Sequence, residues 1–344
     1  MARSWQLRVL VGALLTCACP QLLDDDFEAI SGEPGQGGSA GDSSGSGGTA
    51  GADAGLRVVA SVPEDGAVGV LPDTAFVITF SAAMDRSSVE AAYNSADVPA
   101  SGARFSWSAG DTVLSVQPER ALRAESGVDP AGVAALEYAF EISSLAEDRT
   151  GRHLAATRVS FHVARSITQN IAAVQDRNLT GNWRADGNYG VADCERVDTT
   201  VCVGDSISAG EPTYKGFMTF DLRALPAALV AIHAAELGCV VSFMFGTPFD
   251  DLGTLRIEPV SFETIGDAAF NGTTVAAPAN VSVQAAVGDS LSADVLAAVS
   301  ADWSAGAASQ FRLTFATGSD QDGVADLFQC EWSTARVRVN YWLP

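Results

Sequence analysis

An acidic turn near the C-terminus has the spacing best suited to metal chemistry. Asp320, Asp322 and Asp326 place three carboxylates on one turn that contains Gly323. Ca²⁺ takes about six to eight oxygen ligands, and a D-x-D-G turn can supply several of them from one short loop. The turn therefore predicts a calcium site. A solvated acidic turn is the alternative, because the EF-hand pattern is incomplete here.

Three aromatic residues are candidates for carbohydrate binding. Trp183, Tyr189 and Tyr214 lie in or beside expected loops. An aromatic ring has a large apolar face, which can stack on a sugar when it is exposed or pack in a core when it is buried. The three residues are therefore a candidate ligand-binding platform, with core packing as the alternative.

Residues suited to catalysis are scarce. The chain has three histidines and lacks the H-E-x-x-H and Walker patterns, and G-x-S-x-G occurs only within the glycine- and serine-rich segment 31–55. The adjacent acids Asp250 and Asp251 point apart, which is the wrong arrangement for a pair of glycosidase carboxylates. We therefore expect a protein that is not an enzyme and requires no cofactor, with Ca²⁺ as the candidate ion.

Four cysteines in the C-terminal half are expected to form two disulfides. An even number of cysteines in an exported domain indicates disulfide bonds. Cys194 and Cys202 bracket one acidic loop and are expected to join, so that Cys239 and Cys330 would connect distant parts of a sheet. A zinc site is the alternative, but the spacing contains no CxxC pair and no histidine is close in sequence.

Residues 1–19 have the features of a secretory signal that ends in a lipid-attachment site. Two arginines precede the short apolar run 9–15, as is typical of such signals. The Leu-Leu-Thr-Cys run that ends at Cys17 resembles the lipobox of bacterial lipoproteins, and Cys19 follows it. The resemblance implies an anchor in the membrane through a lipid on Cys17 or Cys19, at the outer membrane or the cell surface. Thr16 departs from the usual lipobox, and an ordinary cleaved signal is the alternative.

A low-complexity tether follows at residues 20–55. Within residues 31–55, 10 of 25 residues are glycine and five are serine, and residues 20–55 contain seven acids and no base. Such a segment cannot bury apolar surface and is expected to be a disordered linker with a reach of about 25–30 Å.

The charge balance limits the partners. The chain has 42 acidic and 20 basic residues, a formal net charge of −22, and Lys215 is its one lysine. A surface this acidic repels a phosphate backbone, so we expect no nucleic acid partner. Hydrophobic residues make up 47% of the chain, which is enough for folded cores, and we expect an all-β protein with two β-sandwich domains.

The first domain is expected at residues 56–165. Short alternating runs at 76–80, 103–107, 113–116, 138–142 and 159–163 predict strands of an immunoglobulin-like sandwich, with a small helical insert near 88–93. The start of this region resembles the bacterial Ig-like domain of the S-layer protein SbsA, through the segments VPEDGAVGV at 62–70, FVITFS at 76–81 and MD at 84–85. That resemblance implies a spacer or scaffold on a cell surface.

The second domain is expected at residues 166–344. Runs at 216–221, 230–237, 240–245, 254–260, 311–315 and 336–341 predict strands of a jelly-roll-like sandwich. The sequence KGFMTFDL at 215–222, followed by Leu225-Pro226, resembles the DNRLRE-type module, a carbohydrate-binding-like domain of bacterial surface proteins. Lys215 stands where that module usually has arginine. The resemblance implies polysaccharide or another cell-envelope component as partner, although the acidity of this half disfavours an acidic polysaccharide unless calcium bridges it.

Two functions therefore compete at the level of sequence. One is a structural or adhesive surface lipoprotein that needs no small ligand. The other is a carbohydrate-binding lipoprotein, assisted by calcium, whose C-terminal domain captures the glycan.

Overall fold

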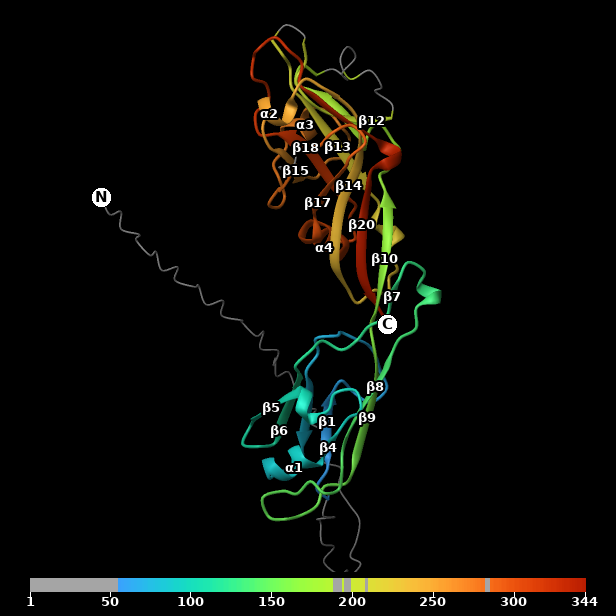
Figure 1. Cartoon of the computed structure of the whole chain (residues 1–344), viewed down its shortest axis with the longest axis vertical. Coiled ribbons are helices and arrows are strands. Elements are labelled where there is room, and N and C mark those ends of the chain that lie inside the picture. The colour runs from blue at the N-terminus through green and yellow to red at the C-terminus, as the bar shows by residue number, and fades with distance from the viewer. Residues whose placement is uncertain (1–54, 188–193, 195–198, 208–209, 282–284) are drawn as a thin grey trace, which may run out of the picture. The chain divides into compact units, whose positions relative to one another are not determined.

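The computed structural model describes residues 55–344 except 188–193, 195–198, 208–209 and 282–284 (Figure 1). The signal segment, Cys17, Cys19 and most of the tether lie outside the described residues. Within the described part of the chain, no helix is long and apolar enough to cross a membrane.

Residues from Val58 to Val163 build two four-stranded sheets, with strand orders β1-β3-β6-β5 and β2-β9-β8-β4. The strands confirm the expected all-β fold of this region. Their bounds are β1 (Val58–Val62), β2 (Ala67–Val70), β3 (Phe76–Phe80), β4 (Tyr93–Asn94), β5 (Ala103–Ser108), β6 (Val113–Pro118), β8 (Glu137–Ile142) and β9 (Thr157–Val163).

The two sheets share one core because their strands alternate. Phe76, Ile78 and Phe80 of β3 are buried, and the residues between them are more exposed. The Phe76 ring stacks on Phe140 of the other sheet, with centroids 5.2 Å apart, and meets Phe161 edge-on at 5.4 Å. This inward alternation from both sheets is what defines a β-sandwich.

The short helical insert is confirmed as α1 (Arg86–Ala92). Asp85 caps it, since its carboxylate accepts a hydrogen bond from Ser88 N at 2.8 Å and satisfies one of the unpaired donors of the first turn. Two 3₁₀ turns, η1 (Ala100–Gly102) and η2 (Pro130–Gly132), complete this region.

The C-terminal half is also built from strands (Figure 1). Together with β7 from the first half, they follow the order β16-β15-β18-β13-β12-β19-β14-β20-β10-β7, with β11 on β13 and β17 on β14. The strand bounds are β7 (Ser126–Gly127), β10 (Arg165–Ala172), β11 (Gly181–Arg184), β12 (Thr200–Gly204), β13 (Tyr214–Phe220), β14 (Ala231–Phe245), β15 (Leu255–Pro259), β16 (Ala279–Val281), β17 (Ser290–Asp294), β18 (Ser309–Phe315), β19 (Leu327–Glu331) and β20 (Arg336–Leu343). The helical elements are α2 (Pro248–Asp251), α3 (Asp267–Asn271), α4 (Leu296–Ser304), η3 (Leu222–Ala224) and η4 (Trp332–Thr334).

Strand β14 corrects one expectation from the sequence. The segments 230–237 and 240–245, expected as separate strands, form one 15-residue strand. Its first half pairs with β20 and β17, and its second half pairs with β19, with an irregularity in that pairing between Val241 and Phe243. Strand β14 therefore joins the part of the sheet with β17 and β20 to the part with β19. Side chains from both parts pack into a single core, which forms the sandwich of the C-terminal half. Examples from that core are Val339, Leu237, Phe311 and Phe328.

One segment does not follow the expected division at residue 165. The two-residue strand β7 pairs in parallel with the start of β10, and Val133 packs with the core of the C-terminal half. Arg165 donates hydrogen bonds to the carbonyls of Pro130 and Val133 at 2.9 and 2.7 Å.

Candidate functional site

Two charged sites of opposite sign stand out in the C-terminal half. The first, called here the acidic cluster, consists of Asp205, Glu211, Asp251, Asp320 and Asp326. Sheet order brings its members together: the end of β12 and the end of β14 both pair with Leu327, the first residue of β19. Residues just beyond these strand ends therefore meet.

The carboxylates of the acidic cluster form two overlapping groups. Within each group, one carboxylate oxygen of every member lies within 4.8 Å of the others. Asp205, Glu211 and Asp320 make one group, and Asp251, Asp320 and Asp326 make the other, so Asp320 is common to both.

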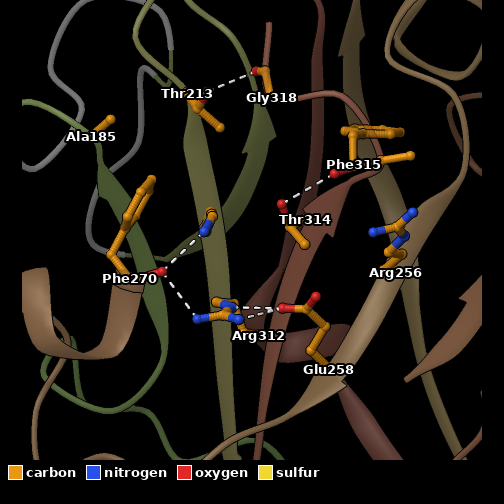
Figure 2. A pocket seen from close by; sticks show the side chains of 11 residues that line it. Ala185, Thr213, Arg256, Glu258, Phe270, Arg312, Thr314, Phe315 and Gly318 are labelled. Carbon is orange, nitrogen blue, oxygen red and sulfur yellow. Dashed lines mark hydrogen bonds and ion pairs between the residues drawn. The ribbon is translucent and has the colours of Figure 1, made fainter. Parts of the chain in front are cut away.

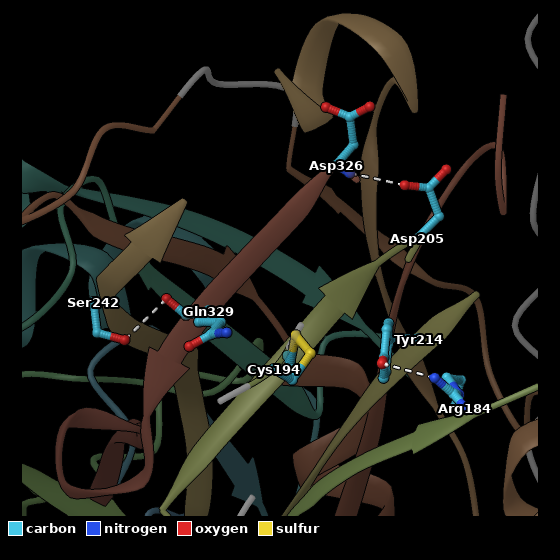
Figure 3. Close-up of a disulfide and its surroundings, with 8 residues drawn as sticks. Arg184, Cys194, Asp205, Tyr214, Ser242, Asp326 and Gln329 are labelled. Carbon is cyan, nitrogen blue, oxygen red and sulfur yellow. Dashed lines mark hydrogen bonds between the residues drawn. A yellow bond between two sulfur atoms is a disulfide. The ribbon is translucent and has the colours of Figure 1, made fainter. Parts of the chain in front are cut away.

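Burial differs across the cluster. Asp205, Asp326 and Glu211 are buried, whereas Asp320 and Asp251 are exposed at the rim. Figure 3 shows Asp205 at the end of β12 and Asp326 beside it, with both carboxylates directed beyond the strand ends. The cluster is thus deep on one side and open to solvent on the other.

Hydrogen bonds fix the buried members. Asp326 N–H donates to Asp205 Oδ1 at 2.8 Å, and Thr247 N–H donates to Asp326 Oδ1 at 2.6 Å. Glu211 accepts from Ser319 Oγ at 2.9 Å and from Gly323 N–H. Backbone donors from the loop after β14 and the loop before β19, together with the Ser319 hydroxyl, therefore hold these carboxylates in place.

The electrostatics of the acidic cluster favour protonation or a bound cation. Burial, followed by the charges of Asp251, Asp205 and Asp320, raises the pKa of Asp326 to about 6, even though the Thr247 N–H bond lowers it. Burial also raises the pKa of Asp205. Among the described residues, no lysine or arginine forms an ion pair with any of the five carboxylates.

The calcium turn expected from the sequence is therefore only partly brought together. Asp320 and Asp326 belong to the acidic cluster, but Asp322 belongs to neither group. Its carboxylate accepts a hydrogen bond from Val324 N–H at 2.7 Å and caps its own turn. Asp322 therefore lies outside the acidic cluster, in which Asp205, Glu211 and Asp251, distant in sequence, join Asp320 and Asp326.

The second site is a pocket of about 370 Å³, called here the cationic pocket. It lies over β13, β18 and β15, and Figure 2 shows the residues that line it. Lys215, Arg256 and Arg312 bring three of the nine bases of residues 166–344 to it, beside one acid, Glu258. Strand pairing explains the grouping, because Glu258 lies opposite Arg312 and Arg256 lies opposite Thr314.

Contacts in the cationic pocket leave one cation available. Arg312 is buried and bound to Glu258, with 2.7 Å from Nε to Oε2, and it also donates to the carbonyls of Ala269, Phe270 and Gly272. Lys215 Nζ donates to Phe270 O at 3.0 Å, and burial lowers its pKa, with Arg312 lowering it further. Arg256 is exposed, and its guanidinium makes no hydrogen bond or ion pair within the described residues.

The predicted aromatic platform is not formed by these three residues. Tyr214 is fully buried among Cys194, Cys202, Ala325 and Leu327, so the prediction of an exposed ring is wrong. Trp183 is half-buried, and its indole N–H donates to Asp267 Oδ1 at 2.9 Å. Tyr189 lies outside the described residues.

Both expected disulfides are present. Cys194 joins Cys202 across eight residues, with Cα atoms 6.2 Å apart (Figure 3). Cys239 of β14 joins Cys330 of β19 across 91 residues, with Cα atoms 6.0 Å apart. Disulfides of this kind are typical of exported proteins.

Comparison with known proteins gives one clear result: residues 52–131 match the family of the bacterial Ig-like domain. This confirms, for these residues, the resemblance to a bacterial Ig-like domain. The match covers the N-terminal part of that domain and does not extend to the C-terminal half. No curated protein matches the chain.

Solved structures give weak similarities. An L,D-transpeptidase from Mycobacterium smegmatis is 16% identical over 65% of this chain and 73% of its own, with a TM-score of 0.24. The N-terminal part of the bacterial S-layer protein SbsC is 10% identical over 48% of this chain and 40% of its own, with a TM-score of 0.23. A carbohydrate-binding module of the β-sandwich superfamily is 9% identical over 84% and 98%, with a TM-score of 0.16. These similarities are too weak to assign a function.

Proposed function

We propose that the protein is a non-catalytic structural or adhesive lipoprotein exposed on a bacterial cell surface. The observation that carries this proposal is the match of residues 52–131 to the bacterial Ig-like domain, in a region whose strands form two facing four-stranded sheets. The two disulfides support an oxidising compartment outside the cytoplasm.

The anchor in this proposal is a lipid on Cys17 or Cys19, followed by the acidic tether. Cells that express the full chain would be grown with a clickable fatty acid, and the protein would then be isolated and its label measured. We expect the label in the wild type and its loss in Cys17→Ser with Cys19→Ser. A Cys194→Ser with Cys202→Ser variant is the control, which should keep the label. An unlabelled wild type found in the medium would contradict the anchor.

The structural role is tested by binding to isolated cell envelopes. Purified protein without the lipid, made as residues 20–344, should sediment with envelopes of the source bacterium and should not sediment with protein-free liposomes. Envelopes stripped of their proteins by protease distinguish the type of contact, because adhesion to a protein layer is then lost and adhesion to a glycan is kept. A protein that sediments with no envelope preparation would contradict the adhesive role.

A second candidate function is binding of a carbohydrate that carries negative groups, and the cationic pocket favours it. Residues 166–344 contain nine bases and 21 acids, whereas the pocket is lined by three bases and one acid, so its local charge is positive in an acidic domain. Arg256 is exposed and leaves its guanidinium available for a carboxylate, which it can bind with two parallel hydrogen bonds.

This candidate is tested with a soluble polyuronate and with neutral dextran. The protein should bind the polyuronate only, and Arg256→Gln should weaken binding about 10-fold, the effect of losing about 1.4 kcal/mol. Arg223→Gln is the matched control, because Arg223 is exposed but pairs with Asp221 outside the pocket. Equal loss in both variants would show general charge attraction rather than a site.

A further inference from the structure

We propose that the acidic cluster is a binding site for a hard divalent cation, with Ca²⁺ as the ion that fits it. The ligands come from three segments: Asp205 and Glu211 lie between β12 and β13, Asp251 follows β14, and Asp320 and Asp326 precede β19. This inference is independent of the proposed function, since the acidic cluster shares no residue with the cationic pocket and requires no glycan.

Two buried oxygens without partners point to a ligand. Asp205 is 0% exposed and Asp326 is 1% exposed. In each, Oδ1 accepts a backbone hydrogen bond, whereas Oδ2 has no hydrogen-bond partner among the described residues. A buried carboxylate oxygen left unpaired is strongly unfavourable, so a cation that it can coordinate would remove the penalty.

Two glycines make room for Asp326. Gly246 follows β14 with a φ of +65°, and a Cβ there would overlap the Asp326 carboxylate. Gly204 ends β12 with a φ of +135°, and a Cβ there would overlap the Asp326 main-chain carbonyl. The backbone of two strands therefore approaches Asp326 more closely than any other residue type would allow.

The donor set selects the class of cation. Every side chain in the cluster offers oxygen, and neither group contains histidine or cysteine, which favours Ca²⁺ over zinc. Carboxylates can bind through one or both oxygens, so the three carboxylates of either group can supply up to six of the about six to eight ligands. Mg²⁺ requires a near-ideal octahedron and keeps several waters, and a site built from three loops and five carboxylates suits it less.

The exposed rim provides the route for the ion. Asp320 and Asp251 face solvent, and Asp320 belongs to both groups. A bound ion would neutralise part of the mutual repulsion among five carboxylates. It would also join the loops after β12 and β14 to the loop before β19, so binding should stabilise the C-terminal half.

The test measures Ca²⁺ binding to the purified mature chain after removal of metal with EDTA. Titration calorimetry with CaCl2 should give a Kd below about 1 mM, which is at the weak end of extracellular calcium sites. Thermal unfolding in CaCl2 should occur at a higher temperature than in EDTA. Asp320→Asn should weaken binding at least about 10-fold, and Asp205→Asn and Asp326→Asn should do the same. MgCl2 at equal concentration should bind more weakly.

Asp322→Asn is the matched control. Asp322 lies in the same acidic turn and carries the same charge, but its carboxylate caps the turn outside the cluster. This variant should bind Ca²⁺ within about twofold of the wild type. Unfolding of each variant in EDTA shows whether it is folded. A wild type that neither binds Ca²⁺ nor gains thermal stability would overturn the proposal, and so would an Asp322→Asn variant that loses as much binding as Asp320→Asn.

Discussion

Asp148 illustrates how single carboxylates stabilise this acidic chain. It is 3% exposed, and its Oδ1 accepts hydrogen bonds from Thr150 N–H and Arg152 N–H at 2.8 and 2.9 Å. Its Oδ2 accepts from Arg152 Nε at 2.7 Å. The Thr150 hydroxyl and then these backbone and guanidinium donors hold the pKa of Asp148 far below its usual range. The folded state therefore stabilises the ionised form of Asp148.

This arrangement predicts a specific pH dependence for the Ig-like domain. Because the folded pKa is lowered, the stabilisation is complete above the unfolded value of about 3.9 and is lost as the pH falls below it. Asp148→Asn should lower the melting temperature at pH 7, and the difference from the wild type should narrow at pH 3. The exposed Asp97 provides a control, since Asp97→Asn should change little at either pH. A constant difference for Asp148→Asn at both pH values would contradict this account.

At the scale of elements, strand β14 and its disulfide connect the two parts of the C-terminal sheet. Cys239 lies where β14 pairs with β17, and Cys330 lies on β19 opposite Val241. The bond closes a loop of 91 residues, whereas Cys194–Cys202 closes one of eight. A longer closed loop restricts the unfolded chain more, so the two bonds should differ in their effect on stability.

Removal of the long-range disulfide should therefore cost more. Cys239→Ala with Cys330→Ala should lower the free energy of unfolding by about 4–5 kcal/mol, and Cys194→Ala with Cys202→Ala by about 2–3 kcal/mol. Urea unfolding followed by fluorescence measures both values. If the two pairs destabilise the protein equally, loop length does not set their contribution.

At the scale of the whole molecule, two separate cores predict separable stability. Phe140 belongs to the core of the Ig-like domain, and Phe311 belongs to the core of the C-terminal half. Each is a buried phenylalanine whose truncation to alanine should cost about 3–5 kcal/mol. In calorimetry of the mature chain, Phe140→Ala should shift one transition and Phe311→Ala the other. A shift of both transitions by either variant would show that the halves unfold as one unit.

The net charge of −22 predicts a dependence on salt. Like charges repel most in the compact state, and added salt screens this repulsion. Raising NaCl from about 0.01 to 0.5 M in the presence of EDTA should therefore raise the melting temperature. EDTA keeps calcium from contributing to the effect. A melting temperature that falls with NaCl would mean that attractive ion pairs outweigh the repulsion.

Local patterns were sufficient for part of this protein. Alternation in the segment 76–80 predicted β3 with its inward Phe76, Ile78 and Phe80, because a strand shows its two faces in its own sequence. The same logic predicted β5, β6, β8 and β9. The cysteine pairing was predicted from the bracketed acidic loop. The lipid anchor, the calcium ion and the glycan stay predictions, because they depend on residues or ligands that these observations do not include.

The order of the strands in the sheet determined which residues meet in the acidic cluster. The sequence by itself determined that Asp320 and Asp326 share a turn, but only the pairing of β12 and β14 with the start of β19 brings in Asp205, Glu211 and Asp251. Likewise, a side chain at the start of a strand can lie on either face of the sheet. The residues packed around Tyr214 show that its ring lies on a covered face. Spacing along the chain reports on contacts within a turn or a strand. Which strand ends meet, and which face is covered, depends on partners outside the local segment, as Asp205 is 121 residues from Asp326.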